Sequence, residues 1–188
     1  IVYAGGFGGL AKSTDAGGSW STVWNGDFAY AMAIDPADPR ILYVVATTTG
    51  VARSADGGTT WSYRNNGLPV VGTSVPIYNI KIDPTNTSRL YAFEQSTGDI
   101  YRTVDAGLNW SRINGLQTGE IAYTVAFDPL DQNLVYLGAQ SGVYRSVDGG
   151  ATWVAMSVPL GTLAVTSVLV DPAVPANITL ICASGTVG

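Results

Sequence analysis

The chain has 188 residues, of which 46% are hydrophobic and 12% are charged, with a formal net charge of −5 and no histidine. This apolar content argues against intrinsic disorder, and the excess of acidic residues argues against nucleic-acid binding, which relies on Lys and Arg at phosphates. The lack of histidine excludes imidazole metal ligands and histidine-based catalytic triads. No apolar run approaches the roughly 20 residues of a membrane-spanning helix.

Segments with the composition of β-strands follow one another along the chain, and none has the periodicity of a helix. The order is clearest at 29–36, 41–47, 50–56 and 59–65, which we name strands A, B, C and D of one unit. Asp35 and Pro36 end strand A, because proline cannot continue a central ladder.

The same order recurs before and after this unit. Strands B, C and D alone precede it, at 1–6, 9–15 and 19–24. Two complete units and one A–B pair follow it, at 78–84, 90–95, 99–105 and 109–114, at 123–129, 134–140, 142–148 and 152–157, and at 165–172 and 178–184.

Four aspartates mark the period of this repeat. Asp15, Asp56, Asp105 and Asp148 are separated by 41, 49 and 43 residues, and a period of about 40 to 50 residues with four strands is typical of β-propeller blades. The sequence therefore predicts an all-β fold, a single β-propeller segment of four-stranded antiparallel blades. The expected blades are 1–24 (strands B to D), 29–65, 77–114, 121–157 and 165–184 (strands A and B). Because these strands close no ring without a surplus strand, we expect a piece of a larger propeller.

Each aspartate lies in a short segment that ends on tryptophan, at the turn from strand C to strand D. The four copies read "STDAGGSW", "SADGGTTW", "TVDAGLNW" and "SVDGGATW". Asp and Ser side chains can accept hydrogen bonds from turn amides, and a tryptophan can pack between neighbouring blades. Four catalytic copies would serve no purpose, so we interpret the segments as structural corners and assign no catalytic residue. Their principal residues are Asp15, Trp20, Asp56, Trp61, Asp105, Trp110, Asp148 and Trp153.

The copies "SADGGTTW" and "SVDGGATW" resemble the Asp box of the bacterial neuraminidase repeat, Ser-x-Asp-x-Gly-x-Thr-Trp. That repeat occurs in sialidases, xyloglucanase-type glycoside hydrolases, sortilin-like receptors and photosystem II assembly factors. The resemblance implies a β-propeller in which the box is a hairpin on the outer rim, away from the ligand face. "TVDAGLNW" departs from the pattern at Leu108 and Asn109, which we expect to weaken that corner.

The D–A and B–C loops of a propeller share the face opposite the corners, and their contents form the candidate ligand face. Aromatic residues beside carboxylates suit a carbohydrate-binding cleft, although ordinary solvated turns would have similar contents. The longest loop, 65–76, has the length of a functional loop. The candidate residues on this face are Trp24, Asp27, Tyr30, Tyr78, Glu94, Asp99, Glu120 and Tyr123.

The enzymes of these similar families need particular side chains, which can be looked for in this sequence. A sialidase needs converging arginines, whereas Lys12, Arg53, Arg102 and Arg145 recur on strand C, far from the axis. A xyloglucanase-like hydrolase needs two opposed carboxylates, for which the acids of the candidate face are the available residues. The Asp-Pro turns lack the carboxylate density of a calcium loop, so we expect no metal and no cofactor.

Two functions remain open from sequence alone. The first is a non-catalytic, secreted, cell-surface or periplasmic propeller that serves as an interaction or structural module. The alternative is a fragment of a glycoside hydrolase, xyloglucanase-like or sialidase-like, with a carbohydrate-binding loop face. The apolar terminal strands at 165–172 and 178–184 are expected to pair with the N-terminal strand or with another copy, so the expected partners are a protein, a second copy or a glycan. No nucleic acid and no membrane span are expected.

Overall fold

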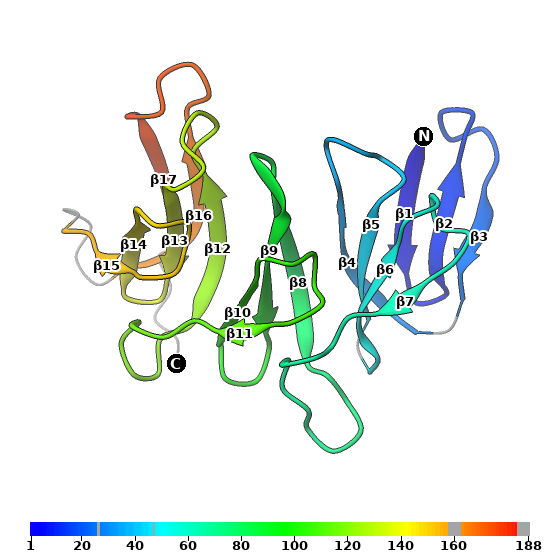
Figure 1. The fold of residues 1–188 in the computed structure, drawn as a ribbon, viewed down its shortest axis with the longest axis horizontal. Coiled ribbons are helices and arrows are strands. Elements are labelled where there is room, and N and C mark those ends of the chain that lie inside the picture. Colours follow the sequence, from blue (N-terminus) through cyan, green and yellow to red (C-terminus); the bar gives the residue numbers. More distant parts are fainter. Residues whose placement is uncertain (26, 47, 158–162, 184–188) are drawn as a thin grey trace.

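In the computed structural model the chain forms a row of antiparallel β-sheets that lie side by side (Figure 1). The structure describes residues 1–25, 27–46, 48–157 and 163–183. Within these ranges there are strands, turns and bends but no helix, and so no helix that could span a membrane. The predicted all-β class with antiparallel four-stranded sheets is confirmed.

Each sheet is called a blade below, and its strands keep the order A to D of the sequence. Blade 1 contains β1 (Val2–Gly6), β2 (Gly9–Ser13) and β3 (Ser21–Trp24). Blade 2 contains β4 (Ala29–Ile34), β5 (Leu42–Ala46), β6 (Gly50–Ser54) and β7 (Ser62–Tyr63). Blade 3 contains β8 (Ile77–Asp83), β9 (Asn86–Glu94), β10 (Ile100–Thr103) and β11 (Ser111–Arg112). Blade 4 contains β12 (Ala122–Phe127), β13 (Val135–Ala139), β14 (Gly142–Ser146) and β15 (Val154–Ala155). The terminal pair consists of β16 (Ala164–Val170) and β17 (Ile178–Ala183).

The B strands lie at the centre of the core. Every residue of β5 and of β13 is buried, as are Leu90–Glu94 in β9. A neighbouring blade or strand covers both faces of these strands, and this explains why they read as continuous apolar runs instead of alternating with polar residues. The outer strands β7, β11 and β15 have two residues each, and both residues are exposed.

Tyrosines of the B strands join each blade to the next. The hydroxyls of Tyr3, Tyr43 and Tyr91 donate to the carbonyls of Gly57, Ala106 and Gly149, over 3.3, 3.3 and 3.1 Å. Each acceptor is the residue after a corner aspartate of the following blade. The three successive interfaces are therefore built by one repeated contact.

The corner tryptophans add a second repeated contact in the opposite direction. Nε1 of Trp61 donates to the carbonyl of Val23, and Nε1 of Trp110 donates to that of Arg64, over 2.9 and 2.7 Å. Both acceptors lie three residues after the corner tryptophan of the preceding blade. Trp110 is 4% exposed, whereas Trp20, for which the described residues contain no preceding blade, is 46% exposed.

Each corner aspartate holds its own turn. In the second corner, Asp56 Oδ1 accepts from the Thr60 amide over 2.8 Å, Oδ2 accepts from the Thr60 hydroxyl over 2.6 Å, and Ser54 donates to Oδ1 over 2.8 Å. The third corner keeps this pattern, because Asn109 Nδ2 replaces the hydroxyl and donates to Asp105 over 2.8 Å. The substitution expected to weaken this corner thus leaves its hydrogen bonds in place.

The ends of the row stay apart. β1 and β17 lie at the edges of the first and last sheets, at opposite sides of the molecule (Figure 1). β17 pairs with β16 and is an edge strand of its sheet, so the expected pairing of these terminal strands with the N-terminal strand or with another copy stays a prediction. Among the described residues the blades form an open row and not a closed ring.

Candidate functional site

The B–C turns and the D–A loops interlock at one end of the blades, which we call the loop end. The Thr48 amide donates to Asp27 Oδ2 over 2.7 Å, so the loop that leaves blade 1 holds the B–C turn of blade 2. The amide of Gln140 donates to the Ile121 carbonyl over 2.9 Å, and the Ser141 amide donates to Glu120 Oε1 over 2.7 Å. The corners lie at the other end, beside the A–B turns, where the Gly57 amide donates to the Arg40 carbonyl over 2.9 Å.

Three tyrosines of the A strands occupy equivalent positions near the loop end. Tyr30, Tyr78 and Tyr123 are each the second residue of their strand, and each falls at the point where the pairing register with strand B shifts. Such β-bulges turn a side chain out of the regular alternation and are frequent beside binding sites. The three residues, called the tyrosine row below, therefore occupy the same strand position in three successive blades. Tyr30 is 44% exposed, and Tyr78 and Tyr123 are half-buried.

The first tyrosine of the row belongs to a group of three aromatic rings. The rings of Phe7 and Phe28 lie 4.4 Å apart between centroids, and those of Phe28 and Tyr30 lie 4.5 Å apart in an edge-to-face arrangement. Phe7 is 92% exposed. Sequence reasoning missed it, although a phenylalanine between two Gly-Gly pairs, "GGFGG", cannot be buried by its own turn. This aromatic group offers flat apolar surfaces of the kind that bind the face of a ring.

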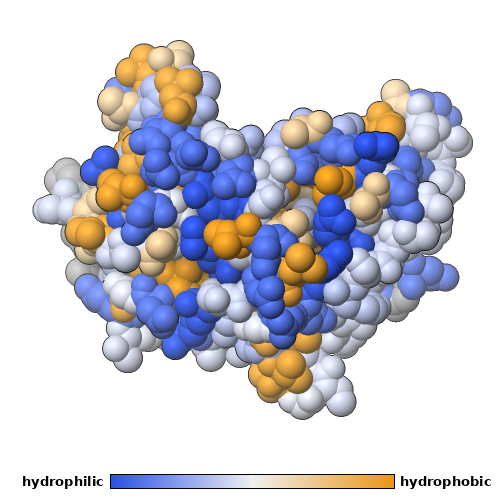
Figure 2. Space-filling model, in the orientation of Figure 1, coloured by the Kyte–Doolittle hydropathy of each residue, from blue (hydrophilic) through white to orange (hydrophobic). Residues whose placement is uncertain are grey.

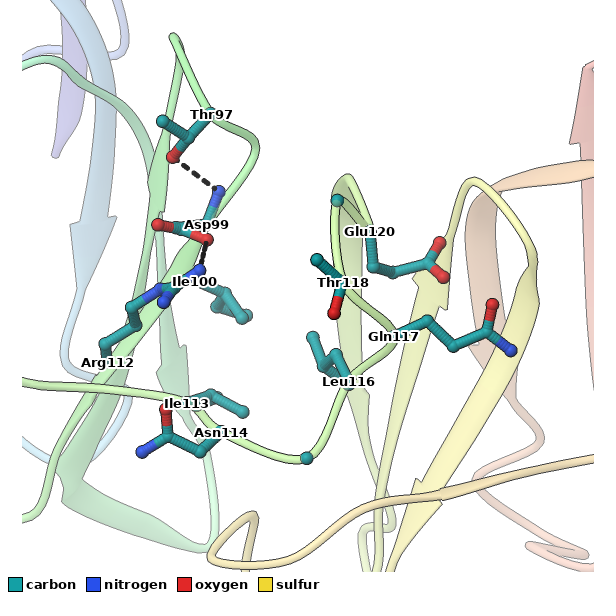
Figure 3. Close-up of a pocket in the computed structure, with 12 residues that line it drawn as sticks. Thr97, Asp99, Ile100, Arg112, Ile113, Asn114, Leu116, Gln117, Thr118 and Glu120 are labelled. Carbon is teal, nitrogen blue, oxygen red and sulfur yellow. Dashed lines mark hydrogen bonds and ion pairs between the residues drawn. The ribbon is translucent and has the colours of Figure 1, made fainter.

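A cavity of about 380 Å³ opens at the loop end between blade 3 and the loop that leads to blade 4 (Figure 3). Asp99 and Arg112 form an ion pair of 2.5 Å on its blade 3 side, and Leu116 and Thr118 lie on the opposite side. The carboxylate of Glu120 points away from this cavity, toward blade 4 (Figure 3). The lining therefore combines one ion pair with uncharged polar and apolar groups.

The acids of the loop end already have several partners. Asp27 accepts hydrogen bonds from the amides of Phe28, Thr48 and Thr49 and from the Thr48 hydroxyl. Burial alone would raise the pKa of Asp27, but the bonds from Thr48, Phe28 and Thr49 together outweigh it and hold the pKa below its ordinary value. Asp27 thus stays ionised at neutral pH and does not suit donation of a proton.

Glu94 is the second candidate acid whose carboxylate accepts hydrogen bonds from nearby residues of the chain. It is 2% exposed and caps its own B–C turn by accepting from the amides of Ser96 and Thr97 and from the Thr97 hydroxyl. Burial raises its pKa, and the bonds from Thr97 and Ser96 lower it by more, so the pKa lies below its ordinary value. Its expected place on an open ligand face is wrong, because the carboxylate is turned back onto its own loop.

Glu120 links two blades. It is 8% exposed, and its carboxylate accepts from the Ser141 amide and hydroxyl and from the Tyr144 hydroxyl, the last over 2.9 Å. Glu120 and Asp27 therefore do the same work, each tying a D–A loop to the B–C turn of the following blade. Asp99 and Glu120 both line the cavity, but Asp99 pairs with Arg112 and the Glu120 carboxylate accepts from Ser141 and Tyr144.

Trp24 is the clearest correction among the candidates. It is 9% exposed and belongs to a core cluster with Leu10, Ala29 and Val44. β3 continues to Trp24, which pairs with Leu10 across a register shift. The pairing carries the indole into the core, whereas the sequence position suggested a loop residue.

The loop between β7 and β8 projects from the loop end as a hydrophobic tip (Figures 1 and 2). Val70 and Val71 are 66% and 60% exposed. An isolated bridge between Val71 and Ser74 closes the tip. The length that singled out this loop in the sequence thus corresponds to an apolar projection at the loop end.

No protein-family model matches the chain. It is 29% identical to a xyloglucanase of a Paenibacillus species over 204 aligned positions, which cover 83% of this chain and 20% of that enzyme. It is 30% identical to a xyloglucanase of Hypocrea jecorina over 129 positions, which cover 60% of this chain and 14% of that enzyme. The chain spans a fifth or less of the length of the curated relatives it matches.

Solved structures show the same architecture. A GH74 enzyme of Niastella koreensis superposes with a TM-score of 0.69 at 20% identity, over 97% of this chain and 31% of that one. At this identity the likeness shows the fold alone. The chain is a β-propeller segment, as its repeats predict.

Proposed function

We propose that this chain is a propeller segment of a glycoside hydrolase of the xyloglucanase type, and that its loop end binds the polysaccharide. The observation that carries the proposal is the sequence similarity to xyloglucanases over 83% of the chain. Of the two functions left open by the sequence, this similarity supports the hydrolase fragment over the non-catalytic module. Assignment of the corners to the Asp-box repeat is part of the same proposal.

The geometry of the loop end supports polysaccharide binding. A β-glucan presents flat apolar ring faces and a rim of hydroxyls, so it needs aromatic surfaces beside hydrogen-bonding groups. The tyrosine row and Phe7 supply the aromatic surfaces. Asp99, Arg112 and Thr118 supply polar groups at the neighbouring cavity.

This segment contributes binding and not bond cleavage in our proposal. Asp27 and Glu94 have lowered pKa values, and a general acid needs a raised one. Glu120 ties two blades together. The acid pair of an inverting or retaining hydrolase would then come from elsewhere in the enzyme. Because a polysaccharide does not cross membranes, we place the protein outside the cytoplasm, secreted, on the cell surface or in the periplasm.

Calorimetric titration with xyloglucan oligosaccharides tests the proposal. Tyr30→Ala and Phe7→Ala should each weaken binding at least about ten-fold, by loss of ring stacking. Tyr63→Ala is the matched control, since Tyr63 is 60% exposed on the outer strand β7, and it should bind like the parent chain. Absence of binding, or equal losses in all three variants, would contradict the proposal.

A further inference from the structure

The D–A loops that leave blades 1, 2 and 3 each contain the dipeptide Asn-Gly. The three copies are Asn25–Gly26, Asn66–Gly67 and Asn114–Gly115. Gly26 lies outside the described residues, so the structure allows a comparison of the other two copies. An asparagine before glycine is chemically labile, because glycine has no Cβ to shield its backbone nitrogen from the asparagine side chain.

The copy that follows blade 2 is held by blade 3. Asn66 Nδ2 donates to Asn109 Oδ1 over 2.6 Å, and the Asn66 carbonyl accepts from the Trp110 amide over 2.8 Å. Gly67 lies directly against the same backbone, since a Cβ built on it would come within 2.0 Å of the Trp110 carbonyl oxygen. The Asn66 side chain can therefore rotate toward the Gly67 nitrogen only after this contact opens.

The copy that follows blade 3 lies at the edge of the loop-end cavity (Figure 3). Asn114 and Gly115 are both exposed. Within the part of the chain that the structure describes, neither the Asn114 side chain nor the Gly115 amide makes a hydrogen bond. A Cβ built on Gly115 would meet no heavy atom within 4 Å. Nothing in the described structure thus holds the Asn114 amide away from the nitrogen that follows it.

We propose that Asn114 is a site of spontaneous deamidation in the folded protein. The Gly115 nitrogen bonds to Asn114 Cγ, the Cγ–Nδ2 bond breaks, and the proton of the Gly115 nitrogen leaves with Nδ2 as ammonia. Water then opens the cyclic succinimide at either carbonyl and gives aspartate or isoaspartate. The reaction consumes water, releases ammonia and transfers no electrons.

The product changes the chemistry of the cavity edge. A new carboxylate joins a lining whose charged side chains are Asp99, Arg112 and Glu120, so the local charge becomes more negative. In isoaspartate the side-chain carbon enters the backbone, which lengthens the loop that leads to Glu120. The inference rests on the geometry of the loop and is independent of polysaccharide binding.

Incubation of the purified chain in mildly alkaline buffer tests the proposal. Peptide mapping by mass spectrometry follows aspartate and isoaspartate at Asn114 and at Asn66, two sites that share the sequence Asn-Gly-Leu. We expect conversion at Asn114 to be at least about ten-fold faster than at Asn66, because two hydrogen bonds must first break at Asn66. In urea, with the chain unfolded, the two rates should become similar.

Two variants supply the controls. Asn114→Gln should remove the early product, because the longer side chain closes its ring slowly, and exposure of this residue makes misfolding unexpected. Asn109→Ala removes the acceptor of the Asn66 side chain, so it should accelerate conversion at Asn66 and leave the rate at Asn114 unchanged. Equal rates at the two sites of the folded chain, or conversion at Asn114 only after unfolding, would overturn the inference.

Discussion

The two ends of the blades differ in how far their structure repeats from one blade to the next. At the corner end the same side chains make the same hydrogen bonds four times, from Asp15 to Asp148. At the loop end the connections vary in length, from the two-residue turn between β13 and β14 to the long apolar loop between β7 and β8. The comparison teaches that repetition in this chain maintains the architecture, while variation supplies the surface that meets a ligand.

The acids show the same division. Corner aspartates bond within their own turn, four residues away at most, whereas Asp27 and Glu120 reach 21 residues along the chain to hold the next blade. Variants at the corner end should therefore change stability and leave binding intact. Variants at exposed rings of the loop end should do the reverse.

The largest loss of stability is expected from Arg89→Ala. The Arg89 guanidinium is 5% exposed, pairs with the fully buried Asp83, and donates to the carbonyls of Gln132 and Gly149 in blade 4. Removal leaves a buried carboxylate without its cation, which costs about 3–5 kcal/mol of unfolding free energy. Arg40→Ala is the control, because the Arg40–Asp38 pair is exposed and should contribute little. Denaturant unfolding measures both, and equal losses would contradict the account.

The next largest loss of stability is expected at Trp110, and it should exceed the loss at Trp20, the equivalent corner tryptophan of blade 1. Trp110→Ala removes a 4% exposed indole and its bond to Arg64, and should cost about 3–4 kcal/mol. Trp20→Ala removes an indole that is 46% exposed and should cost less than about 1.5 kcal/mol. If denaturant unfolding gave the same loss for both, the corner tryptophans would not act by packing on the preceding blade.

Acid should weaken the corners. Burial raises the pKa of Asp148, but bonds from Thr152, Ser146 and Ala151 outweigh it and lower the pKa from 3.8 to about 2. A depressed pKa contributes stability above pH 4 that is lost as the pH falls from about 4 to 2. Asp148→Asn should be less stable at pH 7 by about 1 kcal/mol, since solvent screens an exposed carboxylate. Thermal unfolding against pH should show this difference closing toward pH 2, and a constant difference would contradict the pKa shift.

The smallest stability effect and a clear binding effect are expected from Tyr123→Phe. Tyr123 is half-buried at a bulge, and no described residue receives a hydrogen bond from its hydroxyl. Unfolding free energy should change by less than about 0.5 kcal/mol. Affinity for xyloglucan oligosaccharides should fall about three- to ten-fold, through loss of one hydrogen bond to a sugar hydroxyl. Unchanged affinity would remove Tyr123 from the proposed binding surface.

The architecture could be predicted because the sequence repeats the same strand order and the same corner in each blade. The spacing of Asp15, Asp56, Asp105 and Asp148 and the strand-like segments between them are local features of the sequence. The loop end could not be predicted to the same depth, because its geometry depends on contacts between blades. Trp24 is buried because its strand pairs with Leu10. The Glu120 carboxylate accepts a hydrogen bond from the Ser141 amide, which belongs to the next blade. Tyr30, Tyr78 and Tyr123 were expected on the candidate face, but the register shifts at which they lie have no sequence pattern that predicts them.

In our proposal the loop end binds the polysaccharide, while the corner end only stabilises the blades. Hydrogen exchange of backbone amides with and without a saturating xyloglucan oligosaccharide measures this directly. We expect added protection in the B–C turns and D–A loops, at 27–30, 95–99 and 114–121, and none in the corners at 54–61, 103–110 and 146–153. Protection confined to the corners, or none anywhere while the oligosaccharide is bound, would contradict the claim.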